Sequence, residues 1–424
     1  MSTPSDPSAA AEPARPWIQR IAGALTHHDF RLVWFAALGS TIGTWMQKFA
    51  QSLLVYQLTA STFYLGLDEF LSQLPILMLM LIGGVIADRY DRRRLLTWSQ
   101  YAQAFSAFAL AALVFWNYVT IWHVFALSFI SGCAQAFGGP AYQSLIPSLV
   151  PRRELPNAIA LNSTQFNLSR VLGPMGGTAV LLWLGMAACF LLNGLSFFFV
   201  VIALALIRTA PPVPTGERRA IVDELKSGLD YVRHERLILT LTVLVTIGTF
   251  LAMPLITMLP AFAHTVLADA GGTPETRLSF LMACQGLGAI TGALLIGTLG
   301  RFRHMGRALL GVQALMGLLI ALFALSRTPA LSYLLIFLCG IAFMALFSMS
   351  FSIVQLSVPE HLRGRVVSIY MVAARGGGPL GALAAGYVAD LYSAPAAIVA
   401  NGVLLVLVTA AVAFGGKAKS LREI

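Results

Sequence analysis

The sequence predicts an all-α integral membrane protein with twelve transmembrane helices in two pseudo-symmetric six-helix bundles. Of its 424 residues, 58% are hydrophobic and only 11% are charged. Because soluble domains carry about 25% charged residues, most of this chain is predicted to be solvated by lipid. A single long charged connection near the middle of the chain, together with a weak internal repeat, predicts the division into two halves.

Twelve apolar stretches are long enough to cross about 30 Å of hydrocarbon, which takes about 20 helical residues. They are 31–57, 62–87, 95–116, 120–146, 157–183, 187–207, 237–264, 276–299, 306–326, 330–355, 365–391 and 395–415.

The basic residues lie mainly on one side of these stretches. Of the 28 Lys and Arg residues, 23 fall in the termini and in alternate connections, and only Arg277 and Arg327 fall in the connections on the other side. Cytoplasmic segments of membrane proteins carry the excess of Lys and Arg, so both termini are predicted to be cytoplasmic. The net charge of +10 therefore reflects orientation and indicates no nucleic-acid partner.

The same pattern predicts the domain organisation. The expected order is a cytoplasmic tail that could contain an interfacial helix (1–30), a six-helix bundle (31–207), a cytoplasmic linker (208–236), a second six-helix bundle (237–416) and a cytoplasmic tail (417–424). Apolar residues recur at helical spacing in the linker, which predicts an amphipathic helix there. The halves repeat weakly, since Val-Pro precedes both the fifth and the eleventh stretch.

The sequence contains none of the motifs that mark common enzyme sites. It has no His-Glu-x-x-His, no phosphate-binding loop and no Gly-x-Ser-x-Gly. Its four cysteines lie in four different apolar stretches, without metal-ligand spacing. We therefore expect no enzymatic activity, no cofactor and no metal, and an ion gradient remains as the energy source.

A charged turn joins the second and third stretches and reads Gly-Gly-Val-Ile-Ala-Asp-Arg-Tyr-Asp-Arg-Arg-Arg over 83–94. It resembles the corresponding loop of the major facilitator superfamily of secondary transporters. The resemblance implies a cytoplasmic gate, in which Asp88 contacts the positive amino-terminal end of the eleventh helix. The gate residues are Gly84, Asp88, Arg89, Arg92, Arg93, Gly364 and Arg365. The alternative is that the arginines only set the topology.

A second motif lies in the fifth stretch, where Gly173, Pro174, Gly176 and Gly177 resemble the antiporter motif of the same superfamily. Glycine and proline kink a helix and let a neighbour pack closely. The resemblance implies an exporter, whereas the alternative is ordinary small-residue packing.

Ionisable and amide side chains inside the membrane are candidates for binding substrate or for coupling, because burying them is costly. Asp68 and Glu69 are expected at the outer mouth, and the alternative is that they are ordinary solvated surface residues. Arg375 is expected near the midplane, and the alternative to substrate binding is that it only donates hydrogen bonds to carbonyl groups and a carboxylate. The full set is Lys48, Asp68, Glu69, Arg170, Arg375, Gln73, Gln143, Gln165, Gln285 and Gln355.

Within the superfamily the strings Gly43-Thr44-Trp45-Met46-Gln47 and 224–232 are similar to the bacterial drug and enterobactin-type siderophore exporters. This resemblance implies rocker-switch export of amphiphilic small molecules across the inner membrane, driven by proton antiport. We expect a monomer. Alternatives are a lysophospholipid or other lipid translocator, an importer of the same fold, or a non-transporting membrane sensor.

Overall fold

The computed structural model describes residues 23–89, 91–208, 221–268, 271–300 and 302–415, without the side chains of 80–89, 221–225 and 361. The predicted terminal tails, apart from 23–30, and the first part of the 208–236 linker therefore lie outside the described residues.

The amino-terminal half consists of six long helices. They are α2 (His28–Thr59), α3 (Thr62–Arg89), α4 (Arg92–Phe115), α5 (Ile121–Leu145), α6 (Leu155–Leu184) and α7 (Met186–Leu206), with short 3-10 turns at Gly23–Thr26, Ile146–Ser148 and Arg152–Glu154.

The predicted amphipathic linker helix is α8 (Ile221–His234), and the carboxyl-terminal half follows it. Its helices are α9 (Arg236–Thr257), α10 (Leu259–Ala261), a π-helical turn (Phe262–Val266), α11 (Pro274–Leu299), α12 (Met305–Leu325), α13 (Pro329–Ser357), α14 (Glu360–Leu391) and α15 (Ala394–Phe414).

Each of the twelve predicted stretches corresponds to one helix of at least 21 residues. Several helices extend beyond the apolar stretch into charged residues; α4, for example, begins at Arg92 instead of at 95. Hydropathy detects only the part of a helix that lies in hydrocarbon, so it places such starts too late. The stretch 237–264 differs in another way, because α9 ends before Met258 and a new short helix with Pro260 in its first turn begins at Leu259. Proline has no N–H to continue the helical ladder.

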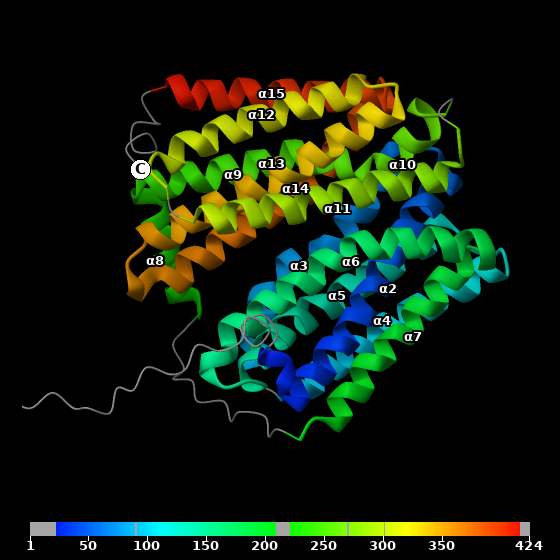
Figure 1. The fold of residues 1–424 in the computed structure, drawn as a ribbon, viewed down its shortest axis with the longest axis horizontal. Helices are drawn as coiled ribbons and strands as arrows, with labels where there is room; N and C mark the ends of the chain where they lie inside the picture. Colours follow the sequence, from blue (N-terminus) through cyan, green and yellow to red (C-terminus); the bar gives the residue numbers. More distant parts are fainter. Residues whose placement is uncertain (1–22, 90, 209–220, 269–270, 301, 416–424) are drawn as a thin grey trace, which may run out of the picture.

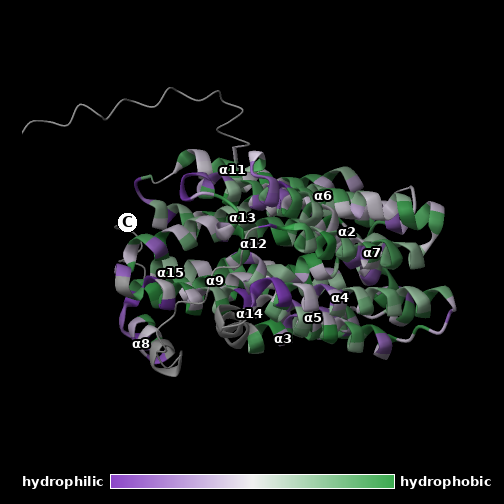
Figure 2. Cartoon of the chain, turned by 90° about the horizontal axis from the view of Figure 1, so that it is seen from below, coloured by the Kyte–Doolittle hydropathy of each residue, from purple (hydrophilic) through white to green (hydrophobic). Residues whose placement is uncertain are grey.

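Eight of the described helical segments are long and apolar enough to span a membrane by length and composition, and all of α9 and α11 to α15 belong to these segments. In the amino-terminal half, α5 and α7 are among these segments. Within the described residues α2, α4 and α6 are not among them, because they carry more of the charged and amide side chains. Hydrophobic residues nevertheless dominate most of the helical length (Figure 2). The polar residues of the bundle are thus concentrated in one half.

The helices form two groups, α2 to α7 and α9 to α15, that meet along two pairs (Figure 1). One pair is α3 with α14, and the other is α6 with α11. Both pairs combine helices from different halves, so a relative movement of the halves changes these contacts first. The domain boundaries themselves stay a prediction.

Close helix packing within the carboxyl-terminal half depends on glycine. A Cβ atom at Gly288 of α11 would overlap the carbonyl oxygen of Phe337 on α13, whereas a Cβ atom at Gly311 of α12 would meet no atom within 4 Å. Small residues that let backbones approach are the usual device for packing helices in lipid.

Gly288→Ala is therefore expected to lower the stability of the purified protein by about 1–3 kcal/mol. The expected readout is a lower aggregation temperature in detergent. Gly311→Ala, in the same half and also inside a helix, is the matched control and is expected to leave that temperature unchanged. Equal aggregation temperatures for the two variants would contradict the α11–α13 packing described here.

Candidate transport site

A hydrogen-bonded chain of polar side chains runs through the amino-terminal half to Asp68 of α3. Gln51 of α2 donates to Asp68 Oδ2 at 2.7 Å, and Ser128 of α5 donates to Asp68 Oδ1 at 2.6 Å. Asn193 of α7 donates to Gln47 at 2.7 Å, and Gln47 reaches Gln51 at 3.5 Å. Four helices thus contribute to one polar network, and its only carboxylate is Asp68.

The position of Asp68 gives this network its significance. Asp68 lies six residues after the start of α3 at Thr62, which corresponds to about 9 Å along the helix. It is partly buried between α2 and α5 instead of lying on a solvated outer surface. A carboxylate held inside a membrane bundle by neutral donors can exchange a proton without breaking an ion pair.

Glu69, next to Asp68, has a different environment. Its Oε1 accepts a hydrogen bond from Gln73 at 3.0 Å, and its Oε2 lies 4.0 Å from Lys48 Nζ. The side chains of Lys48 and Glu69 are 46% and 29% exposed. Because Glu69 is more exposed and has a cation at ion-pair distance, whereas Asp68 is held by neutral donors, Asp68 is the better candidate for reversible protonation.

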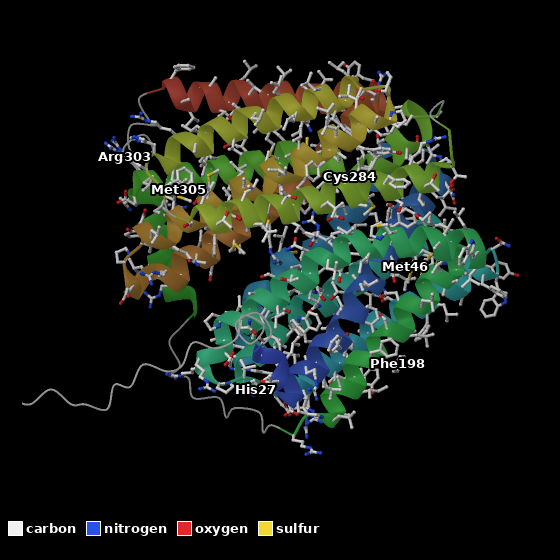
Figure 3. The ribbon with its side chains drawn as sticks, viewed as in Figure 1. His27, Met46, Phe198, Cys284, Arg303 and Met305 are labelled. Carbon is white, nitrogen blue, oxygen red and sulfur yellow. The ribbon has the colours of Figure 1, made fainter. Side chains whose placement is uncertain are left out.

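Arg170 of α6 lies where the two halves meet. Its Nη2 donates to Gln285 of α11 at 2.7 Å, its guanidinium carbon lies 5.4 Å from the ring centre of Trp45, and its buried Nε has no hydrogen-bond partner. No acidic side chain among the described residues forms an ion pair with Arg170. Figure 3 labels Met46 and Cys284, the chain neighbours of Trp45 and Gln285. The result is a partly buried cation with spare donor capacity at its buried Nε.

Trp45 is the centre of this arrangement. Lys48 Nζ lies 5.6 Å from the Trp45 ring centre, and Phe166 packs edge-on against the ring at 6.0 Å. Two cations and a half-exposed aromatic residue, Phe166, therefore surround one indole. Such a group of side chains can bind an amphiphile that combines an apolar body with an anionic or hydrogen-bond-accepting group.

A second polar cluster contains Gln165. Its Nε2 donates to Thr41 at 2.9 Å, and Tyr142 donates to Asn162 at 2.9 Å and approaches Gln165 Oε1 at 3.5 Å. Gln165 is buried and fully engaged with neighbouring helices. This environment fits a structural role of Gln165 better than direct substrate contact.

The remaining predicted candidates do not join these clusters through hydrogen bonds of the described residues. Arg375, Gln143 and Gln355 are exposed. Arg375, in the middle of α14, forms no hydrogen bond or ion pair with another described residue. It therefore stays a candidate as a second cation available to substrate.

The cytoplasmic gate is only partly visible. Gly84, Asp88 and Arg89 are among the residues whose side chains lie outside the described part. Arg92 donates to the carbonyl of Ser144, and Arg93 donates to the carbonyls of Ala205 and Ile207, all within the amino-terminal half.

The opposite side of the predicted gate is described. Arg365 of α14 donates to Ser227 of α8 at 3.0 Å, and a Cβ at Gly364 would meet no atom within 4 Å. The gate therefore stays a prediction. Asp91, in the charged turn, accepts from the backbone N–H groups of Arg93 and Arg94 and so caps α4.

The antiporter-like motif packs α6 against α2. Gly173 faces Trp45 and Met46, Gly177 faces Phe49 and Met46, and Gly176 faces open space. α6 is helical throughout Leu155–Leu184 in spite of Pro174, and the missing N–H of Pro174 leaves the carbonyl of Arg170 without its helical donor. The motif thus lies next to the Arg170–Trp45 group.

Sequence reasoning missed one contact between the halves. Asp390, at the carboxyl end of α14, accepts hydrogen bonds from Ser61, Thr62 and Phe63 at the start of α3. Together with the tilted ring contact between Tyr56 and His264, whose centroids are 5.2 Å apart, it joins the two halves at the end opposite the charged turn between α3 and α4. The spacing Gly386-x-x-x-Asp390, which matches Gly84-x-x-x-Asp88, was the available signal.

Two groups of membrane helices that meet along α3–α14 and α6–α11 around buried polar side chains define a transporter with the major facilitator fold. The solved structure of the nucleoside transporter NupG matches with a TM-score of 0.72 and 13% identity over 91% of this chain and 99% of that one. A bacterial homologue of the lysosomal transporter Spinster matches with a TM-score of 0.71 and 15% identity over 94% and 96% of the two chains.

The chain belongs to the major facilitator family described as "Transmembrane secretion effector", whose model matches residues 21–419. This confirms the predicted superfamily and fold class, and it identifies the chain as a multi-pass membrane transporter and not an enzyme.

Two curated bacterial proteins are similar over most of their length. The multidrug efflux pump Tap of Mycolicibacterium fortuitum is 26% identical over 370 residues, which are 85% of this chain and 88% of Tap. The enterobactin exporter EntS of Shigella boydii is 25% identical over 403 residues, which are 92% of each chain.

Proposed function

We propose that the protein exports amphiphilic small molecules of the drug or siderophore class in exchange for protons. The observation that carries the proposal is the polar network ending on Asp68 inside a largely apolar bundle. Intramembrane carboxylates are expensive, and they mark proton or ion pathways in transporters. The direction of transport is supported by the two similar bacterial proteins, which are an efflux pump and an exporter.

In this proposal substrate enters between the halves and contacts the group formed by Trp45, Lys48 and Arg170. The spare donors of Arg170 bind an anionic or strongly accepting group, and Trp45 and Phe166 contact the apolar body. Arg375, Gln285 and the amide Gln73 supply further polar contacts as the halves tilt. Arg170 and Gln285 come from opposite halves, so substrate binding and the relative position of the halves are coupled.

Protonation of Asp68 supplies the driving step. The proton neutralises the carboxylate that Gln51 and Ser128 now hold by donating to it. A protonated Asp68 is itself a donor, so the network must rearrange its hydrogen bonds. Because Gln51 and Asp68 are on different helices, that rearrangement can move α3 relative to α2. The protein lies in the cytoplasmic (inner) membrane with both termini inside, as the excess of Lys and Arg predicts.

An efflux experiment tests this function. The chain is overproduced in a bacterial host that lacks its own major efflux pumps, and cells preloaded with ethidium or with enterobactin are followed over time. We expect faster loss of at least one compound than in cells carrying the empty vector, and we expect a protonophore to remove the difference. Efflux that survives collapse of the proton gradient would contradict proton antiport.

A further inference from the structure

The carboxylate of Asp390 caps a helix that belongs to the opposite half of the protein. Its Oδ1 accepts from Thr62 N and Thr62 Oγ1, each at 2.7 Å, and from Phe63 N at 3.3 Å, while its Oδ2 accepts from Ser61 Oγ. Thr62 is the first residue of α3. The first N–H groups of a helix have no partner within the helix, and the helix dipole favours a negative charge there.

The end of α14 can approach the start of α3 closely because residue 386 is glycine and has no Cβ atom. Gly386 lies one turn before Asp390, and a Cβ atom on it would be 2.6 Å from Thr62 O and 3.0 Å from Phe63 Cα. Thr62 Oγ1 also donates to the carbonyl of Gly386 at 3.1 Å. These bonds require the outer ends of α3 and α14 to touch, so they exist only when the outer side is closed along this pair.

The same five-residue pattern occurs at the other end of the same helix pair. Gly84-Val85-Ile86-Ala87-Asp88 ends α3, and Gly386-Tyr387-Val388-Ala389-Asp390 ends α14. In both strings Gly precedes Asp by four residues and Ala directly precedes the Asp. Each of the two helices thus carries the pattern at its carboxyl end, and the carboxyl end of α14 lies beside the amino-terminal end of α3.

We propose that Asp390 is an outer latch, which holds the extracellular side closed and opposes the predicted inner latch of Asp88. The two latches lie at opposite ends of one helix pair, so tilting that pair opens one as it closes the other. The balance between inward-open and outward-open states is then set by two equivalent carboxylate–helix contacts. This inference rests on the proposed alternating-access function.

Distances between spin labels test the outer latch without any substrate. The four native cysteines are first replaced by alanine. Labels at Tyr118→Cys and Ala330→Cys then report the outer face, since Tyr118 is exposed in the α4–α5 connection and Ala330 is exposed at the start of α13. We expect Asp390→Asn to increase the ratio of long to short outer distances by about tenfold, because hydrogen bonds to a charged acceptor are lost.

Two further variants keep the test decisive. Gly386→Val is expected to shift the outer distances in the same direction by steric separation, and Ser61→Ala is expected to shift them less, since it removes a single donor. Asp230→Asn, which removes an exposed carboxylate of α8, is the matched control and should change nothing. Outer distances that are the same in the parent, Asp390→Asn and Gly386→Val proteins would overturn the latch. Because no transport is measured, this outcome is distinct from a failure of the proposed export.

Discussion

Asp68→Asn is expected to abolish export driven by a proton gradient while leaving substrate exchange intact. The amide keeps the size of the side chain, its one carbonyl oxygen can still accept from Gln51, and its NH2 group can donate to the Ser128 hydroxyl, but it cannot release or take up a proton. We expect gradient-driven efflux to fall on the order of a hundredfold, the scale of loss when a proton-transferring group is removed.

The measurement compares two modes in proteoliposomes that contain the same variant. One is efflux against a concentration gradient with a proton gradient imposed, and the other is exchange of labelled for unlabelled substrate with no gradient. Glu69→Gln is the matched control, because Glu69 is the adjacent residue but lies near Lys48. It is expected to retain most gradient-driven efflux. Full gradient-driven efflux by Asp68→Asn would refute the role of Asp68.

Arg170→Gln is expected to weaken substrate binding without weakening the fold. Arg170 has a buried Nε without a partner and no carboxylate bound to it among the described residues, so the substitution leaves no buried charge unpaired. We expect the aggregation temperature to stay the same or to rise. The apparent affinity for substrates with an anionic or accepting group should fall about tenfold, as for loss of one charge-assisted hydrogen bond.

Arg170→Lys separates charge from geometry. Lysine keeps the charge but loses the planar fork that reaches Gln285 and stacks on Trp45, so an intermediate affinity is expected. Binding measured by tryptophan fluorescence and stability measured by thermal aggregation give two independent readouts. An unchanged affinity in Arg170→Gln would exclude Arg170 from the substrate site.

Most of the fold could be predicted because lipid imposes a simple rule on the sequence. A helix must remain apolar for about 20 residues, so twelve helices were identifiable one by one. Helix ends were less predictable, since charged residues such as Arg92 continue a helix outside the hydrocarbon. The break after Thr257 was signalled only by the nearby prolines Pro254 and Pro260, which could equally have produced a kink.

The candidate site was less predictable, because it depends on which helices become neighbours. Asp68 could be singled out as an ionisable residue within an apolar stretch, but Gln51 and Ser128 become its partners only when α2, α3 and α5 pack together. Asp390 was overlooked for a similar reason. At the end of an apolar stretch it reads as an ordinary surface charge, and only its contact with Thr62 of the other half distinguishes it.

Proton movement during transport is the most direct test of the central claim. The purified protein is reconstituted into vesicles that contain a pH-sensitive dye, and substrate is added on one side without an imposed proton gradient. The account predicts proton flux opposite to substrate flux, and it predicts the loss of that proton flux in Asp68→Asn. Substrate flux without any accompanying proton movement would contradict it.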